Sequence, residues 1–503
     1  GPEADALAAQ ARIALRAAAD RAIALHAWTV AQRHLADALE ITSDPAELAA
    51  LHLAIAQNDG FMARPEGVDH ALTAADLAAQ LGDRGTENRA RAVAGQILVN
   101  RSMGTEARAI LEPAVANLGE DEPNAAPLFA EVARVYMMLD RNEEAVHRAE
   151  QALRAAAPGR DTEVIAQALV SQGSAIGNLG RFDEAESILR GAMGLADREG
   201  HIGAALRARN NLLSILIVEA PMSTLLPLMN ESVELALRYG IAGWGAQHLE
   251  ARAYANISTG DWDQTRADLA LLADWDLSEL HTAWVATIHG FVDAAAGDKP
   301  TAEARLADAR ALLPGIDTIP QLTSIAIGIA EVHILLGEWS AALEALKGME
   351  GGGNDGLICQ YSAFASAAAG DRDQLQAVWA RTDTLDQLRV SNAIRAHVRA
   401  SLAAASGQWD DARAAYATAR SQYRSLDFNF EGALLELECG AFLGARFEDA
   451  RTAGEAAGAW FAERGATSVV ERYRTNFQGT PAPPSAGAGA PKRAVKVDAE
   501  QPA

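Results

Sequence analysis

The stretch that decides the fold is "NLGRFDEAESILRGAM", which runs from Asn178 to Met193. A glycine stands before a polar residue, an aromatic, two acids and an alanine that opens an apolar helical stripe. A looser copy, "ASGQWDDARAAYATAR", returns from Ala405 to Arg420. We interpret the phrase as a helix–turn–helix corner. The glycine ends helix A, the acid caps helix B, the aromatic fills the corner, and the alanine lets the two helices touch.

The same Gly-x-aromatic-x-x-Ala corner recurs along the chain when Ala185 is taken as its anchor. Clear copies are "GEWSAA", "GQWDDA", "ARFEDA" and "DRNEEA", and in "GDWDQT" Thr265 takes the anchor place. The other anchors, strong and weak, are Ala31, Val68, Ala107, Ala145, Leu225, Ala302, Ala342, Leu375, Ala412 and Ala450. Most neighbouring anchors are 37 to 40 residues apart, with one interval of 33. Such a period is typical of stacked helical hairpins, and it predicts an all-α, right-handed α-solenoid of about twelve units.

Small residues recur where the two helices of a hairpin must approach each other. Twelve residues before the anchors stand Ala or Gly in most units, for example Ala56, Gly95 and Gly173, and Leu213 is bulky. Seven residues after the anchors alanine is again the commonest residue. These positions predict close helix–helix packing within and between units.

Composition supports helix and limits the classes of partner. Of the 503 residues 49% are hydrophobic and only 5% aromatic, and Ala, Leu, Arg and Glu, which favour helix, run through nearly every segment. The formal net charge is -24. A field of this sign repels phosphate backbones and anionic lipid surfaces, so we expect neither nucleic acid nor membrane as a partner.

The cysteines and the chain ends favour a cytoplasmic protein. Cys359 and Cys439 are the only cysteines and lie in apolar helical contexts without CxxC spacing, which fits a reducing compartment. No stretch approaches the roughly 18 apolar residues of a membrane span, and no signal peptide is visible. Gly1-Pro2 is typical of a cloning scar.

One unit carries the marks of a known repeat. Phe129, Ala133, Tyr136, Ala145 and Ala152 stand at the positions at which the tetratricopeptide repeat (TPR) has its small and aromatic residues. The chain therefore resembles the TPR-like superfamily. That resemblance implies a noncatalytic scaffold that binds a protein or peptide in a concave groove.

Most units are longer than the usual TPR, and this feature gives a second resemblance. The repeats from Ala6 to Arg474, with the closing phrase "AGAWFAERGATSVVERYR", look like the C-terminal repeat regions of bacterial signal-transduction ATPases. These include proteins linked to class III nucleotide cyclases and maltose-regulator-type activators. The chain has no GxxxxGK[ST], no cyclase signature and no basic helix-turn-helix. The resemblance implies a regulatory or sensor arm for signal transduction, with any ATPase or cyclase activity in a module absent from this chain.

Composition changes mark the domain boundaries. We expect the solenoid over residues 3–477 and a disordered Pro/Ala/Gly-rich tail over residues 478–503. "EGGGNDG", residues 350–356, predicts a joint that is either a hinge or a tolerated surface insertion.

A search for chemistry finds no catalytic pattern. The histidines include no HExxH and no i,i+4 pair, so no metal site and no cofactor are predicted. His289 and His333 fall at inward helix A positions, where a hydrogen-bonded core histidine is the expected role. Paired carboxylates from different units are conceivable in a helical toroid, but no spacing argues for them.

The concave face is the predicted functional surface. In this architecture the second, fifth and ninth positions of each helix A line the concave face. Counting from the anchors, these positions carry a mixture of polar and aromatic residues. The predicted partner-binding groove consists of Arg134, Gln167, Arg207, Asn210, Gln247, Glu250, Tyr254, Trp284, Thr287, Phe291 and Glu331. Arginine and aromatic side chains on a preformed surface are the residues that protein hot spots use.

Two other functions stay open. A small-molecule sensor would close its repeats around a metabolite, with a cavity near His281, Trp284 and Tyr254. An α/α-toroid enzyme would need the array to close into a ring with carboxylates converging at its centre. We expect the scaffold, with no enzymatic activity, as the leading interpretation.

Overall fold

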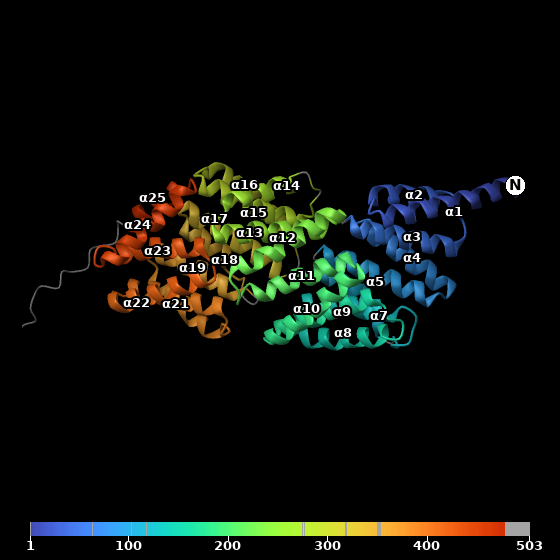
Figure 1. Cartoon of the computed structure of the whole chain (residues 1–503), viewed down its shortest axis with the longest axis horizontal. Helices are drawn as coiled ribbons and strands as arrows, with labels where there is room; N and C mark the ends of the chain where they lie inside the picture. The colour runs from blue at the N-terminus through green and yellow to red at the C-terminus, as the bar shows by residue number, and fades with distance from the viewer. Residues whose placement is uncertain are drawn as a thin grey trace, which may run out of the picture.

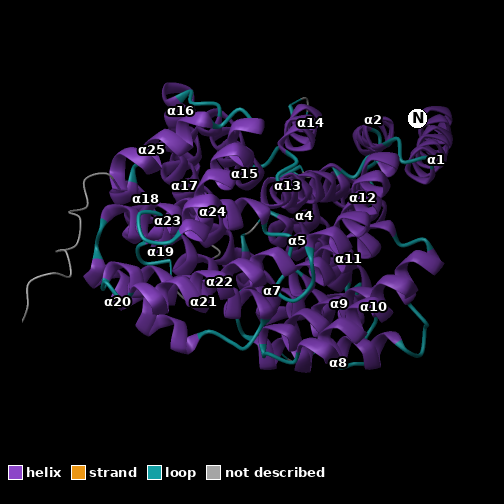
Figure 2. Cartoon of the chain, turned by 60° about the vertical axis from the view of Figure 1, so that its left-hand side comes forward, coloured by secondary structure: helices purple, strands orange, loops and turns teal. Residues whose placement is uncertain are grey.

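The computed structural model describes residues 2–62, 64–101, 103–116, 118–273, 275, 277–316, 319–349 and 354–477. Every regular element in these ranges is a helix, and the remainder is loop and turn (Figure 2). The predicted tail over residues 478–503 lies outside the described residues, as do Gly1 and residues 350–353 of the predicted joint.

Twenty-four α-helices form twelve antiparallel pairs, and a last helix follows them. The first helices of the pairs, called helix A, are α1 (Pro2–Ala24), α3 (Pro45–Phe61), α5 (Arg84–Asn100), α7 (Ala125–Met138), α9 (Thr162–Asn178), α11 (Ile202–Leu216), α13 (Ala242–Thr259), α15 (Glu279–Ala295), α17 (Ile319–Leu336), α19 (Asp355–Ala369), α21 (Arg389–Ala405) and α23 (Asn429–Leu443).

The second helices, called helix B, are α2 (Trp28–Glu40), α4 (Gly67–Leu81), α6 (Gly104–Val115), α8 (Asn142–Ala156), α10 (Phe182–Glu199), α12 (Met222–Tyr239), α14 (Trp262–Leu272), α16 (Lys299–Leu312), α18 (Trp339–Leu346), α20 (Arg372–Arg381), α22 (Trp409–Ser425) and α24 (Glu448–Glu463). The last helix is α25 (Thr467–Phe477), and the 3₁₀ turns η1 (Leu313–Gly315) and η2 (Thr382–Thr384) follow α16 and α20.

The pairs stack in one phase. Each helix A packs against its own helix B, and from α3 onward each helix A also contacts the helix A of the next pair. This nearest-neighbour packing defines an α-solenoid, so the predicted fold class is confirmed.

The alanine and glycine positions explain the close packing. The anchors are buried in eleven of the twelve units, Ala185 and Thr265 at 0% exposure, and Val68 is half-buried. A methyl group added at Gly173 would come within 2.9 Å of the Leu189 side chain, so that crossing admits only glycine at this distance. The small residues therefore set the distance between the two helices of each pair.

The corner of the opening phrase is built largely as predicted. Gly180 ends α9 with φ +81°, a conformation that favours glycine, and Arg181 N donates to Ile176 O at 3.1 Å. One detail differs. Asp183 and Glu184 lie in the first turn of α10 and its N-cap, Arg181, makes no side-chain cap, so the acids act on the helix dipole instead of capping. In the corner of α13 and α14, by contrast, Asp261 does cap Gln264 N.

The solenoid also contacts itself between distant units. Met222 N donates to Leu426 O at 3.0 Å, and Ser223 Oγ donates to Asp427 Oδ2 at 2.6 Å. Arg464 Nε donates to Gly260 O at 2.9 Å. The last two pairs are each separated by 204 residues, roughly five repeat units, so the array coils until the next superhelical turn touches the previous one.

The two halves of the chain differ in their cores. We call α1–α12 the N-terminal half and α13–α25 the C-terminal half; in Figure 1 the first half begins at the right and the second ends at the left, with α11 and α12 near the middle. The N-terminal half has several separate hydrophobic clusters, one of which runs from Ala92 to Ala175. The largest cluster extends from Leu213 of α11 to Tyr473 of α25 and joins most of the C-terminal half into one core, while a smaller cluster with Leu249 and Leu272 is separate from it. Among the described residues, no helix is both long and apolar enough to cross a membrane.

Candidate functional site

In the N-terminal half, equivalent positions of neighbouring A helices contact each other. Gln167 of α9 and Arg207 of α11 hold equivalent positions in successive units, and the structure joins them. Arg207 Nη1 donates to Gln167 Oε1 at 2.8 Å and to Gln167 O at 3.0 Å, and Nη2 donates to Ser171 Oγ at 2.7 Å. Burial lowers the pKa of Arg207 to about 9, which leaves the guanidinium charged at neutral pH.

Arg207 is a structural residue in this arrangement. Its side chain is 2% exposed, and its three hydrogen bonds tie α11 to α9. Arg134 of α7 is similar, because it is buried, donates to Asn100 Oδ1 at 2.5 Å and lies 3.8 Å from Glu131. The prediction that these two arginines face a partner differs from the structure. A guanidinium group has several N–H donors, so it is buried where neighbouring helices supply acceptors for them.

Five amide side chains of the A helices are accessible. Gln96, Gln167, Asn210, Asn211 and Gln247 are all half-buried, and they lie on α5, α9, α11 and α13. Asn211 accepts from Ser174 Oγ at 2.9 Å and donates to Arg207 O at 2.8 Å. We call these five residues the amide row. Each amide carries both a donor and an acceptor, the same groups as a peptide backbone.

In the C-terminal half the predicted residues meet one another instead of a groove. His281 Nδ1 lies 2.9 Å from Glu250 Oε2, and both side chains are buried. Burial opposes the charge of His281, but the nearby Glu250 carboxylate outweighs it and raises the pKa of His281. Burial raises the pKa of Glu250 as well, and the two side chains form a buried hydrogen-bonded pair that joins α13 to α15.

Tyr254 and Glu331 belong to a cluster of buried acids and phenols. Tyr254 Oη donates to Glu331 Oε1 at 2.6 Å. Glu431 Oε1 accepts from Ser258 Oγ at 3.1 Å and from Tyr361 Oη at 3.4 Å. Burial raises the pKa of Glu331 to about 8 and that of Glu431 to about 7. Glu331 is therefore protonated at neutral pH. The acids come from α17 and α23, so this cluster fills the inside of the C-terminal half.

Three more predicted residues fall in the same region. Phe291 is 1% exposed and its ring packs edge-to-face on Trp262 at 5.3 Å and Phe430 at 5.1 Å. Thr287 is buried and donates to Trp284 O at 2.7 Å. The prediction that Phe291, Thr287 and Glu331 line a groove thus differs from the structure, because all three are buried: Phe291 packs on Phe430 of α23, Thr287 lies against Gly328 of α17, and Glu331 bonds Tyr254 of α13. Trp284 is half-buried, with its ring 6.4 Å from that of Tyr254.

Other sequence-based expectations concern histidines and metals. His333 is a hydrogen-bonded core histidine, as predicted, with Nδ1 2.7 Å from Glu338 Oε2 and Nε2 2.6 Å from Arg310 Nη2. In the described part of the chain no group of three or more His, Cys, Asp or Glu side chains could hold a metal ion.

Sequence reasoning missed one surface feature. A pocket of about 560 Å³ lies between the corner of α9 and α10 and the loop before α21, and its walls include Phe182 and Leu388. The corner itself is the opening phrase of the sequence, but its opposite wall is more than two hundred residues downstream, so no local pattern could reveal the pocket.

The fold and these sites define a solenoid of antiparallel helical hairpins. No family matches the sequence, and no curated protein matches it. Among solved structures the chain is similar to a chain of the crystal structure of the APC/C hetero-tetramer Cut9-Hcn1, at 14% identity over 92% of this chain and 96% of that chain, with a TM-score of 0.32. The fold assignment rests on the helix order and packing described above.

Proposed function

We propose that the chain is a noncatalytic scaffold that binds an extended segment of a partner protein along the amide row. The observation that supports this proposal is the row itself. Gln96, Gln167, Asn210, Asn211 and Gln247 are half-buried and lie on the A helices α5, α9, α11 and α13. Amides at this spacing can pair with the backbone of a peptide of almost any sequence.

The neighbours of the row favour binding without large rearrangement. Arg207 fixes Gln167, and Ser174 fixes Asn211, so the amides lose little side-chain entropy when a partner binds. Trp284 is the half-buried aromatic residue near the C-terminal end of the row, and it is the candidate anchor for an apolar side chain.

The broader role that we propose is that of a regulatory arm in a larger bacterial, cytoplasmic signalling protein. The support is the resemblance of the repeats to those of signal-transduction ATPases and the mechanics of the fold. Contacts in the N-terminal half run mainly from unit to unit, so a bound segment that bridges several units would change the curvature of the array.

The catalytic alternative has little support from the geometry. Acids do gather inside the C-terminal half, as a toroid enzyme would require, but Glu331 is 2% exposed and Glu431 is 3% exposed. A substrate could not reach either carboxyl group without opening the core. The small-molecule alternative would need a cavity near His281, whereas the pocket at Phe182 and a second pocket at Arg413 and Phe447 lie elsewhere.

Site-specific photocrosslinking tests the proposed function. A photoreactive residue at Asn210 should crosslink a partner in extracts of the source cells, whereas the same residue at exposed Arg190, on the outer helix α10, should not. With that partner purified, Asn210→Arg should weaken binding at least tenfold. Equal crosslinking at both positions, or unchanged affinity of Asn210→Arg, would refute the amide row as the site.

A thermal melt in the presence of a metabolite panel tests the small-molecule sensor. Stabilisation by one compound that is lost in Trp284→Ala would support the sensor instead of the scaffold.

A further inference from the structure

Two corners of the C-terminal half are covered in the same way by the end of the chain. The first is the Gly260-Asp261-Trp262 corner between α13 and α14. Arg464 Nε donates to Gly260 O at 2.9 Å, and the Arg464 guanidinium lies 3.9 Å from the centre of the Trp460 ring. The Trp460 ring in turn packs edge-to-face on Trp262 at 5.7 Å. An aromatic of α24 and, one helical turn later, the arginine that follows the end of this helix thus cover the corner.

The second covered corner is Gly337-Glu338-Trp339, between α17 and α18. Arg472 of α25 donates to Leu335 O, and the neighbouring Tyr473 ring packs on Trp339 at 5.4 Å. The chemistry is the same as at the first corner: a guanidinium satisfies a backbone carbonyl at the end of helix A, and an aromatic ring covers the aromatic of the corner.

The Gly180-Arg181-Phe182 corner has the same sequence pattern and backbone but lacks such a cover. Its glycine has φ +81°, compared with +89° at Gly260 and +73° at Gly337. Trp262 and Trp339 are buried, whereas Phe182 is half-buried and, within the described part of the chain, has no aromatic ring or cation packed on it. A methyl group added at Gly180 would meet no atom within 4 Å.

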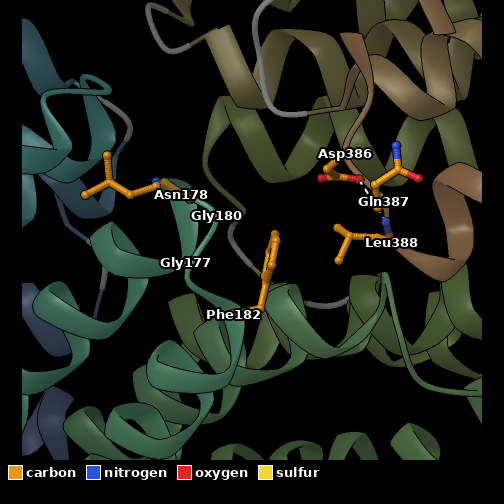
Figure 3. Close-up of a pocket in the computed structure, with 8 residues that line it drawn as sticks. Gly177, Asn178, Gly180, Phe182, Asp386, Gln387 and Leu388 are labelled. Carbon is orange, nitrogen blue, oxygen red and sulfur yellow. Dashed lines mark hydrogen bonds between the residues drawn. The ribbon is translucent and has the colours of Figure 1, made fainter. Parts of the chain in front are cut away.

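The space over this corner is a pocket with a rigid opposite wall. Figure 3 shows Phe182 and Asn178 on one side and Asp386, Gln387 and Leu388 on the other. Asp386 follows Phe182 by the same 204 residues that separate Gly260 from Arg464, so the pocket lies where two superhelical turns face each other.

Hydrogen bonds hold the second wall in place. Arg395 Nη2 donates to Asp386 O at 2.6 Å, and Arg395 Nε donates to Thr382 O at 3.1 Å. Asp386 Oδ1 accepts from Ser391 Oγ at 2.7 Å and from Leu388 N at 3.4 Å, both uncharged donors. The carboxylate at the pocket has no cation among these donors, so it can accept a hydrogen bond from an arginine.

We propose that this open corner, residues 177–182 with 386–388, is a docking site for a helical segment of another protein that presents an aromatic residue and an arginine one turn apart. The ring packs between Phe182 and Leu388, and the guanidinium bonds Asp386 and the carbonyl at the end of α9. The covered corner at Gly260, where Trp460 and Arg464 are one turn apart, supplies the template for this occupant. The pocket volume of about 560 Å³ accommodates an aromatic side chain. This surface is separate from the amide row and does not depend on the proposed function.

The test uses the full chain and a labelled synthetic peptide with the sequence of residues 457–474, which carries Trp460 and Arg464. Fluorescence anisotropy should show saturable binding below about 100 μM. Phe182→Ala and Asp386→Asn, one on each wall, should each weaken binding at least fivefold. The matched control Phe447→Ala, at a half-buried corner aromatic outside the pocket, should leave it unchanged.

The same titration contains the outcomes that would overturn the proposal. Peptides with Trp460→Ala or Arg464→Ala should bind at least fivefold more weakly, because each removes one half of the recognition. No binding at 1 mM peptide would refute the site. Equal affinity of the peptide for the wild type and for Phe182→Ala would also refute it, and this result is expected if the peptide binds by displacing α24 from Trp262. Concentration-dependent dimerisation of the chain alone, abolished by Phe182→Ala, would identify a second copy as the occupant and overturn the assignment to another protein.

Discussion

The corners at Gly180 and Gly260 have one sequence pattern and two environments. Both glycines end a helix A with positive φ, and both are followed two residues later by an aromatic. Over Gly260 the chain itself returns with Trp460 and Arg464, whereas over Gly180 a pocket remains. The sequence of the repeat unit therefore determines the local turn. The position of the unit in the superhelix determines whether the aromatic side chain of that turn is buried in the core or accessible at the surface.

The largest difference between the two corners should appear when the aromatic is removed. Trp262 is 3% exposed and contacts Phe291, Phe430 and Trp460, so Trp262→Ala should lower the free energy of unfolding of the C-terminal half by about 3–5 kcal/mol. Phe182→Ala should lower stability by less than about 1 kcal/mol, because its ring is half-exposed.

Hydrogen exchange on peptides from α13 and α23 measures this contrast. Both should lose protection in Trp262→Ala and keep it in Phe182→Ala. Equal effects of the two substitutions would show that the corner aromatics serve the same packing role throughout, and the distinction between covered and open corners would be lost.

The glycines give the second comparison. Alanine at either Gly180 or Gly260 must adopt positive φ, which costs about 1 kcal/mol. At Gly260 the new methyl group would also come within 2.5 Å of Trp460 Cζ2, while at Gly180 it meets nothing within 4 Å. We expect Gly260→Ala to destabilise by about 2 kcal/mol or more and Gly180→Ala by about half as much. Thermal melts followed by circular dichroism measure both, and a reversed order would contradict the covered corner.

The repeat was readable from sequence because it depends on residues close together in the chain. Glycine, aromatic and anchor alanine fall within a few positions of each other, and eleven of the twelve anchors proved to be buried helix B residues. The contact of Gln167 with Arg207 was predictable for the same reason, since the two residues hold equivalent positions in adjacent units.

The rest depended on contacts between superhelical turns. Phe291 and Glu331 occupy groove positions by local counting, yet Phe430 and Glu431 of α23 cover this region in the folded chain. A period of 37 to 40 residues does not state how many units complete a turn, so neither the filled interior of the C-terminal half nor the pocket at Phe182 could be derived from it.

The buried acid Glu331 predicts that the stability of the C-terminal half depends on pH. Burial raises the pKa of Glu331 from 4.5 to about 8, so the folded state keeps a proton that the unfolded state releases. The resulting stabilisation is complete below pH 4.5 and is lost as the pH rises through 8. Between pH 6 and pH 9 the C-terminal half should lose at least about 1.4 kcal/mol, the equivalent of one pKa unit.

Glu331→Gln separates this effect from general alkaline destabilisation. Glutamine still accepts the Tyr254 hydrogen bond but does not titrate, so its thermal unfolding should vary less between pH 6 and pH 9 than that of the wild type. Glu344→Gln, on the surface of α18, should keep the wild-type dependence. A wild-type melting temperature that is constant over this range would contradict the buried, protonated state of Glu331.

The smallest expected effect concerns the arginine that closes the covered corner. Arg464→Ala removes the hydrogen bond to Gly260 O and the contact with the Trp460 ring, which should cost about 1–2 kcal/mol. Arg451, on the outer side of the same helix, pairs only with exposed Glu448 and Glu455, so Arg451→Ala should change stability by less than about 0.5 kcal/mol. Hydrogen exchange of α24 measures both variants. Because Arg464 bridges two superhelical turns and Arg451 bridges none, similar exchange in the two variants would mean that the return of the chain over Gly260 is held by aromatic packing alone.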